Sequence, residues 1–353
     1  MSYTFGNLQS ITSLDLSYLN TENVLSMNQM FYRCTKLEYL NVKNFNTKKV
    51  IDFYSMFGSC TQLKSLDLIS FNTGNAKTIA KMFQYCTSLT SLDISNFDTS
   101  QVTDMSDLFL SCKNIEKLDL KKFDTSNVET MFYMFGEMTK IKELDLSSFD
   151  TSKVTDMSLM FSSCSSLTSI NLINFDTSKV SYNSKMFEKC TNLKYIDISN
   201  FDTSLINYYS DLFSGCESLT SINFGNRYTR KITHMSGMFS DCSSLVSLDL
   251  TSFDTSELVM AERAFKNCNS LTNVKMDKFS TSKVKSLISM FEKCSSLTSL
   301  YLPNFYTNDI QNTGLNNIFE GCTNLKVSLY PNKCSNLITI LPEYVKVINL
   351  TNY

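Results

Sequence analysis

The sequence predicts an α/β repeat protein, a solenoid in which short repeats stack along one axis. Every step from Cys34 to Cys294 is 26 residues, and Met138 stands at the one step that lacks cysteine. A phenylalanine precedes each of these positions by three residues. Hydrophobic residues make up 42% of the 353 residues, enough for a core that runs through every repeat. A fixed period of this length is the signature of a solenoid, whose repeats bury their apolar sides against their neighbours.

Each repeat is interpreted as a strand, a turn, a short helix and a second turn. In residues 143–164, ELDLSSFDTSKVTDMSLMFSSC, apolar and polar residues alternate over residues 144–146, as in a half-buried strand. Residues 150–152, Asp-Thr-Ser, form a turn cluster. Apolar residues then recur over residues 154–164 at the spacing of one helical face. Stacking therefore predicts a curved solenoid with a parallel β-sheet on its concave face and short helices on its convex face.

One threonine occupies the same turn position in every repeat. Because a buried hydroxyl needs a partner, we expect it to hydrogen-bond main-chain groups of its own or the next coil. This column consists of Thr21, Thr47, Thr73, Thr99, Thr125, Thr151, Thr177, Thr203, Thr229, Thr255, Thr281 and Thr307.

The domain organisation follows from the extent of the repeat. We expect about twelve repeats in residues 1–327, forming one solenoid domain, and a C-terminal cap over residues 328–353. After Cys322 the period fails, and the sequence is rich in β-branched residues and contains Pro331 and Pro342. These features predict an irregular β-type cap, which a solenoid needs to close the end of its core.

The repeat resembles the leucine-rich repeat, Leu-x-x-Leu-x-Leu-x-x-Asn/Cys-x-Leu, with Phe at the Asn/Cys position and Thr at the last Leu. Residues 91–112 and 143–164 are similar to the 26-residue repeat of BspA-type surface proteins, and the resemblance covers about residues 5–327. It implies a leucine-rich-repeat solenoid that is commonly displayed at a cell surface, with suggested roles in adhesion and host contact.

Composition bears on the possible partners. The formal net charge is -2, and no basic block interrupts the balance of 32 basic and 34 acidic residues, which argues against nucleic acid as a partner. No run of about 20 apolar residues is present, so we expect no membrane insertion. The first ten residues lack the features of a signal peptide, so a place at the cell surface or outside the cell is expected from the family resemblance alone.

Catalytic and metal chemistry find no support in the sequence. His234 is the only histidine, and no glycine-rich phosphate loop is present. We therefore expect that the protein is not an enzyme and binds no cofactor. The cysteines lack the clustered spacing of a metal site. Because Met138 replaces one of them as an apolar body, we expect a buried, reduced ladder. Cys322 and Cys334 are the pair for which a disulfide is left open.

The candidate binding site is the concave face of the predicted sheet. Between the two inward-pointing leucines of each strand lies a polar position, occupied by aspartate in seven repeats. One interpretation is an acidic stripe that binds a cationic partner, a sugar or calcium; the other is a solvated face, repeated by duplication and partly neutralised by nearby lysines. The candidate residues are Asp67, Asp93, Asp119, Asp145, Asp197 and Asp249, together with Tyr39, Tyr195, Lys117, Lys121 and Glu143 beside them.

The ninth repeat departs from the pattern, because Arg227 and Tyr228 replace the usual Phe-Asp. The change indicates either a local binding bulge or a degenerate repeat with a patched core. Tyr208 and Tyr209 lie in the neighbouring coil and would support such a patch, and His234 is expected on the surface.

Two functional hypotheses follow. The first is a non-enzymatic binding or adhesion protein that presents the concave face to a protein or glycan partner. The second is a structural scaffold, possibly intracellular, that associates with copies of itself.

Overall fold

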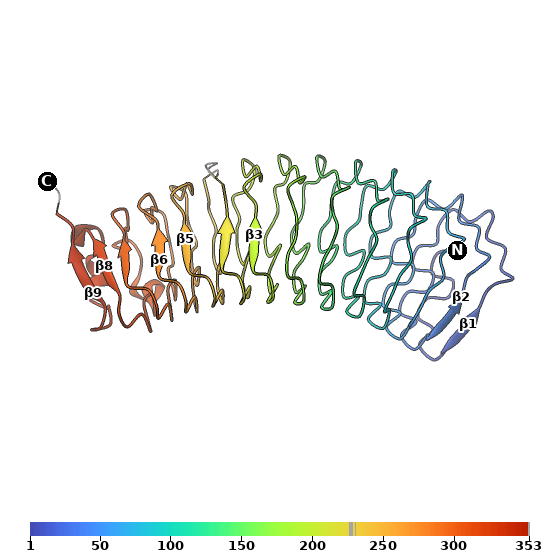
Figure 1. Ribbon diagram of the computed structural model, residues 1–353, viewed down its shortest axis with the longest axis horizontal. Helices are drawn as coiled ribbons and strands as arrows, with labels where there is room; N and C mark the ends of the chain where they lie inside the picture. Colours follow the sequence, from blue (N-terminus) through green and yellow to red (C-terminus); the bar gives the residue numbers. More distant parts are fainter. Residues whose placement is uncertain (226–228, 230, 352–353) are drawn as a thin grey trace. The chain divides into compact units, whose positions relative to one another are not determined.

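The computed structural model describes all residues except 226–228, 230, 352 and 353. The chain divides into two compact units, Met1–Lys179 (unit 1) and Val180–Tyr353 (unit 2). Each unit is a stack of coils that follow one another in sequence order (Figure 1). The leucine-rich-repeat solenoid expected from the sequence is confirmed within each unit.

Short parallel strands form on one side of each stack, here called the strand face. The strand expected at residues 144–146 is not formed, and residues 65–68, 91–94 and 117–120 likewise run along this face without strand pairing. Corresponding residues of paired strands are 26 residues apart in the first three pairs, so that Leu14 lies opposite Leu40 and Leu248 opposite Val274. Within the described residues the strands form four sheets, whose order is β1 (Ser13–Asp15) and β2 (Tyr39–Asn41); β3 (Tyr195–Asp197) and β4 (Ser221–Asn223); β5 (Ser247–Asp249) and β6 (Asn273–Lys275); and β7 (Ser299–Tyr301), β8 (Lys326–Leu329) and β9 (Lys346–Asn349).

The expected short helix of each repeat is wrong. Met27 and Gln29 donate their N–H groups to carbonyl oxygens of the next coil at 2.9 and 2.8 Å, while Met30 donates back to Met27 at 3.1 Å. Gln29 and Arg33 have positive φ angles of 54° and 59°. Because alternate N–H groups bond the next coil and every fourth residue is left-handed, the segment is a series of tight turns. We call this side of the stack the turn face.

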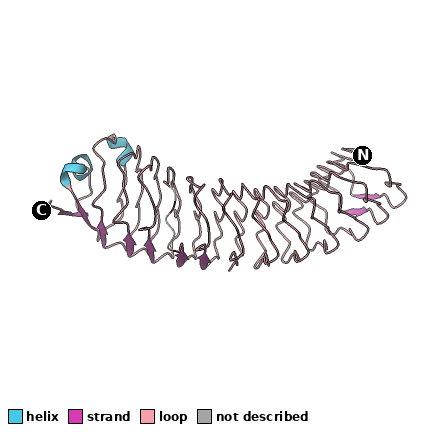
Figure 2. Cartoon of the chain, turned by 90° about the horizontal axis from the view of Figure 1, so that it is seen from above, coloured by secondary structure: helices cyan, strands magenta, loops and turns pink. Residues whose placement is uncertain are grey.

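Helices are confined to the C-terminal part of the described chain (Figure 2). They are the 3₁₀ helices η1 (Asn312–Leu315) and η2 (Pro331–Lys333) and the single-turn α1 (Ser335–Ile338). The element η1 lies where the sequence has two extra residues. β8 and β9 continue the sheet of β7 in parallel. The division into a solenoid over residues 1–327 and a cap over residues 328–353 stays a prediction. No helix among the described residues has the length and apolar character needed to cross a bilayer.

Phenylalanine columns form the centre of each stack. The rings of Phe83 and Phe109 stack at 5.9 Å with an interplanar angle of 4°, and those of Phe265 and Phe291 stack at 4.8 Å. All four side chains are fully buried. Burial of one such side chain stabilises the fold by roughly 1.5–3 kcal/mol, so the column holds neighbouring coils together.

The threonine column bonds main-chain groups of the next coil, as expected. Thr125 Oγ1 donates to the carbonyl oxygen of Asp150 at 2.8 Å and accepts the N–H of the same residue at 2.8 Å. Thr73 makes the same two bonds with Asp98. One hydroxyl thus joins two coils at the turn that follows the strand.

The cysteine column also joins coils. The twelve cysteines are free thiols and all are buried. Cys112 Sγ donates to the carbonyl oxygen of Phe83 in the preceding coil at 3.1 Å. Burial raises the pKa of Cys112 to about 12, so the thiol stays protonated. Cys322 and Cys334 likewise donate their thiols to main-chain oxygens, at 3.0 and 3.1 Å.

Around the ninth repeat, aromatic side chains fill the core. Arg227 and Tyr228 lie outside the described residues. Phe224 stands where most repeats have leucine or isoleucine, and its ring meets that of Phe253 edge-on at 5.1 Å. Tyr209 is buried and packs 6.3 Å from Phe253. On the turn face, Tyr208 stacks on the half-buried His234 at 4.1 Å.

Candidate functional site

The polar position at the end of each strand has a structural role that the sequence reasoning missed. Asp93 Oδ1 accepts the N–H of Ser95 at 3.0 Å, and Asp145 Oδ1 accepts the N–H and the hydroxyl of Ser147 at 3.1 and 2.6 Å. Such Asx turns end the strand. Asn41 makes the same kind of bond. The turn therefore needs an aspartate or an asparagine, and it does not need the negative charge of aspartate.

These turns keep the carboxylates ionised. Hydrogen bonds from Ser95 hold the pKa of Asp93 below its ordinary value, and those from Ser147 do the same for Asp145. The pKa of Asp249 is lowered first by its bond from the Thr251 side chain. Each of these groups is therefore a fixed negative charge at neutral pH.

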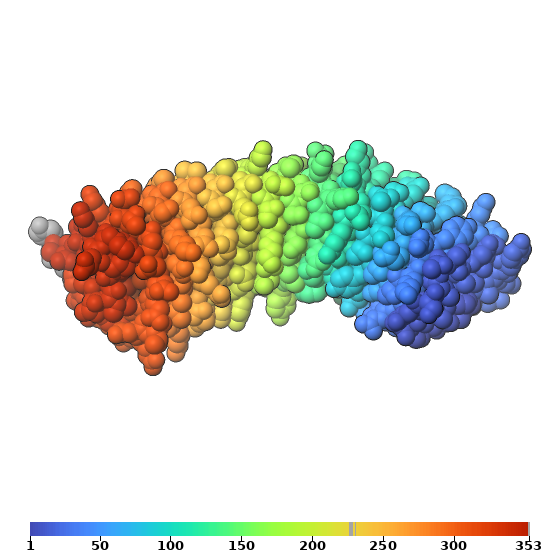
Figure 3. Space-filling view, turned by 90° about the horizontal axis from the view of Figure 1, so that it is seen from below, coloured from blue at the N-terminus to red at the C-terminus, as the bar shows by residue number. Residues whose placement is uncertain are grey.

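Eight of the eleven candidate residues lie on the strand face of unit 1. All eight are exposed, and Tyr39 is 54% exposed. Successive coils form adjacent bands across the surface of each unit (Figure 3). The coils that carry them stack closely, with the rings of Phe83 and Phe109 and those of Phe109 and Phe135 each 5.9 Å apart, so the charged candidates form one dense surface. We call this surface the strand-face mosaic; its members are Asp67, Asp93, Lys117, Asp119, Lys121, Glu143 and Asp145.

The mosaic carries both signs of charge. Lys121 contributes to the lowered pKa of Asp145, and Lys122 contributes to that of Asp93. Lys122 was not among the candidate residues. The lysines therefore flank the aspartate column, and the surface is not uniformly acidic.

The other three candidates lie in unit 2, and each already has a polar partner or neighbour there. Tyr195 Oη donates to Asp197 Oδ2 at 3.3 Å, and Asn223 Nδ2 donates to the same oxygen at 2.9 Å. Lys275 Nζ lies 3.3 Å from Asp249 Oδ2. In unit 2 the equivalent position is thus a set of local pairs.

The turn face of unit 1 arranges its carboxylates differently. Hydroxyl and carboxylate side chains alternate from coil to coil, and Ser26 Oγ donates to Asp52 Oδ2 at 3.1 Å. Alternation places two coil spacings, about 10 Å, between like charges. The column runs Ser26, Asp52, Thr78, Asp104, Thr130, Asp156. On the strand face, by contrast, four aspartates follow one another without a break, although like charges opposite each other are unfavourable.

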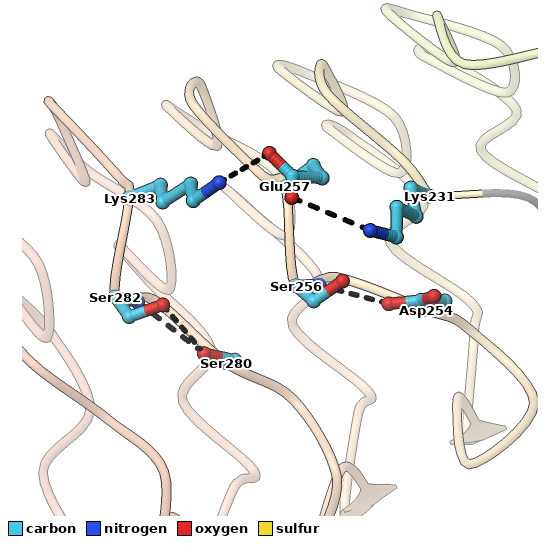
Figure 4. Close-up of polar contacts among 7 residues, drawn as sticks. All are labelled: Lys231, Asp254, Ser256, Glu257, Ser280, Ser282 and Lys283. Atoms are coloured by element: carbon cyan, nitrogen blue, oxygen red, sulfur yellow. Dashed lines mark hydrogen bonds and ion pairs between the residues drawn. The ribbon is translucent and has the colours of Figure 1, made fainter.

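An ion-pair ladder in unit 2 shows what a structural charge column looks like. Glu257 lies between Lys231 and Lys283, at 3.5 and 2.5 Å (Figure 4). Such exposed pairs contribute little to stability. They satisfy their charges within the chain, whereas the two ion pairs of unit 1, Lys64–Glu38 and Lys113–Glu137, involve no residue of the mosaic. Within the described residues, no group of three or more His, Cys, Asp or Glu side chains could hold a metal ion.

Comparisons with known proteins agree with this architecture. The model of a family described as "Mycoplasma protein of unknown function, DUF285" matches residues 1–117, 89–194, 167–274 and 233–340. No curated protein matches the chain. A leucine-rich repeat protein from Bacteroides ovatus has a similar solved structure, with a TM-score of 0.61 and 20% identity over 99% of this chain and 87% of that chain.

Two further solved structures are more distant. A leucine-rich cell surface protein from Faecalibacterium prausnitzii is 16% identical, covering 96% of this chain and 80% of its own, with a TM-score of 0.39. A leucine-rich repeat protein from Leptospira interrogans is 13% identical, covering 99% and 94%, with a TM-score of 0.24. The BspA-type repeat expected from the sequence is confirmed. By its sequence and its fold, the chain belongs to the DUF285 family of leucine-rich repeat proteins.

Proposed function

We propose that this chain is a non-enzymatic binding protein that presents the strand-face mosaic to a protein partner at a cell surface. One observation carries the proposal: four consecutive coils place Asp67, Asp93, Asp119 and Asp145 on an exposed face, although asparagine would make the same turn. The turn does not require these charges, and neighbouring aspartates repel one another. Their repetition therefore fits a role in binding.

A protein fits this surface better than a glycan does. The mosaic carries the Lys117 and Lys121 side chains beside its aspartates, and these charges are fixed on a repeated backbone. Protein surfaces carry both signs of charge at such spacings, and complementary charges give specificity and fast association. Tyr39 at one end adds an exposed aromatic side chain of the kind that enriches protein interfaces.

The surface location is part of the proposal and is motivated by the BspA-type repeat. Protease treatment of intact cells that express the chain measures it directly. Loss of the chain from intact cells supports the proposal, and protection until lysis contradicts it.

The binding role is tested with a triple variant, Asp93→Asn, Asp119→Asn and Asp145→Asn. The intact chain is immobilised and screened against a library of secreted and cell-surface protein domains, and each binder is measured again with the variant. We expect the variant to bind at least about tenfold more weakly, because three interfacial charges are lost. We also expect the affinity of the intact chain to fall with added salt.

A matched control is available on the turn face of the same unit. The variant Asp52→Asn, Asp104→Asn and Asp156→Asn makes the same change in net charge, and these carboxylates also accept main-chain N–H groups. It should bind like the intact chain. Equal weakening in both variants, or an affinity that does not change with salt, would contradict the mosaic as the binding surface.

A further inference from the structure

A polar hollow lies in unit 2, at a break in the strand face. Within the described residues, β4 and β5 belong to separate two-stranded sheets. Between their ends is a hollow of about 380 Å³, within the range of roughly 300–1,000 Å³ typical of small-molecule sites. Its polar lining comes from Asn223, Asp249, Thr251, Ser252 and Lys278.

Gly225 is one of the residues that line the hollow. It has a φ of +69°, and a Cβ at this position would lie 2.9 Å from both the Cβ and the carbonyl oxygen of Ser199 in the preceding coil. Most repeats carry a side chain at this position, as Ser199 and Thr251 do. Glycine therefore lets the backbone pack closely against the preceding coil, and it adds only backbone atoms to the hollow.

The hollow continues toward the turn that follows the strand. A second hollow of about 300 Å³ shares Thr251 and Lys278 with the first and is lined further by Asp254, Ser256 and Ser280. Figure 4 shows these last three residues, with the main-chain N–H of Ser256 donating to Asp254 Oδ1 at 3.0 Å within one turn. Together the two hollows form a groove lined mainly by hydroxyl, amide and charged groups.

The polar groups of the first hollow are fixed in place. Asp249 Oδ1 accepts the N–H of Thr251 at 3.0 Å and its hydroxyl at 2.6 Å. Asn223 Oδ1 accepts the N–H of Gly225 at 3.0 Å. Because these side chains are already oriented, a ligand would not bear the entropic cost of ordering them.

The hollow and its rim carry charges of both signs. An anion would meet the Asp249 carboxylate. A cation would meet the ammonium group of Lys275, 3.3 Å from that carboxylate, and the lysine at position 278. A neutral ligand with several hydroxyl groups avoids both penalties, since each hydroxyl both donates and accepts hydrogen bonds.

We propose that this hollow binds one ring of a neutral sugar. Sugar hydroxyls donate to the Asp249 carboxylate and accept from Lys278, while Thr251 and Ser252 line the ring. The site lies in unit 2 and shares no residue with the strand-face mosaic. It therefore goes beyond the proposed protein-binding function, and the two proposals are tested independently. A single ring in an open polar site binds weakly, with a Kd on the order of millimolar.

Saturation-transfer difference NMR detects binding of this strength. The probes are the methyl glycosides of glucose, galactose, mannose and N-acetylglucosamine, each added to the full chain. We expect at least one probe to receive saturation. The variant Ser252→Trp should abolish the signal by filling the hollow, and Ser148→Trp, the same turn position in unit 1, should preserve it.

A second variant tests the site independently if the first one misfolds. Lys278→Met keeps the length of the side chain and removes its ammonium group, and it should reduce the same signal. Absence of transfer to all four probes with the intact chain, or a signal that survives both unit 2 variants, would overturn the sugar site. The triple asparagine variant of the mosaic should leave the NMR signal unchanged, and loss of the signal in that variant would contradict a separate site.

Discussion

At the scale of single residues, Asp107 is a carboxyl group in an unfavourable place. It is 6% exposed and has a positive φ of 55°. Burial raises its pKa to about 6, although Lys81 and a 3.3 Å hydrogen bond from Gln84 act in the opposite direction. At neutral pH the side chain is therefore ionised where the protein disfavours its charge.

The variant Asp107→Asn should stabilise unit 1 at pH 7. The folded pKa lies above the unfolded value of about 3.9, so the protonated group stabilises the fold below about pH 4, and this contribution is lost as the pH rises through about 6. We expect a gain of about 2 kcal/mol at pH 7 and none at pH 4. Thermal melts at the two pH values measure the difference.

Asp124→Asn serves as the contrast, because hydrogen bonds from Ser126 lower the pKa of Asp124. Its carboxylate is favoured in the folded state above the unfolded pKa, so this variant should not gain stability at pH 7. Similar gains in the two variants would mean that burial is not the cause.

The sequence predicted which residues would be polar and exposed on the strand face, but not why aspartate stands there. The spacing Asp-x-Ser, as in Asp93 and Ser95, was a visible signal of an Asx turn. Strand alternation predicts only the face on which the aspartate lies, and it does not predict the turn that the aspartate forms. Whether the eleven candidate residues bind a partner stays a prediction.

At the scale of elements, the turn face shows the limit of periodicity as a guide. The spacing of residues 154–164 fits a helix, but over so short a stretch it fits a series of tight four-residue turns equally well. The neighbouring coil decides between them, because N–H groups that bond the next coil are not available to a helix. Periodicity within one repeat contains no information on such bonds. The same limit applies to the strands, because strands form where expected at β1 to β7 but residues 144–146 do not pair as a strand.

The threonine column is the element-scale contact most open to test. Replacing Thr125 by valine keeps the shape and removes the hydroxyl that both donates to and accepts from the Asp150 main chain. We expect a loss of about 1–2 kcal/mol, because two main-chain groups lose their partner. Urea unfolding monitored by circular dichroism measures it.

Thr125→Ser keeps the hydroxyl and should recover most of that stability. If serine is as damaging as valine, the methyl group and not the hydrogen bonds holds the turn, and the account of this column is wrong.

At the scale of the whole molecule, the 26-residue period predicted the fold class because each coil contacts mainly the coils next to it. Long-range topology then follows from sequence order alone. The ninth repeat is where this reasoning stopped, since the loss of one phenylalanine does not indicate how Phe224 and Tyr209 pack around it. The polar hollow beside Gly225 was equally invisible, because it depends on the break between β4 and β5.

Self-association, the second hypothesis from the sequence, is a property of the whole chain. Among the described strands, β1 pairs with β2, and Leu14 in β1 is only half-buried. Pairing of strand edges is one route by which chains associate. If the hypothesis holds, light scattering will show a mass that rises with concentration, and Leu14→Pro will suppress the rise. A constant monomer mass would exclude it over the range measured.

The hydrogen-bonded thiols have a consequence for where such a protein can exist. Only the thiolate attacks a disulfide, and the column keeps its sulfur atoms protonated and out of reach of solvent. A folded chain with twelve cysteines is thus inert to the glutathione pool and to oxidising surroundings alike. The cysteine content of the folded chain therefore does not require a reducing or an oxidising compartment.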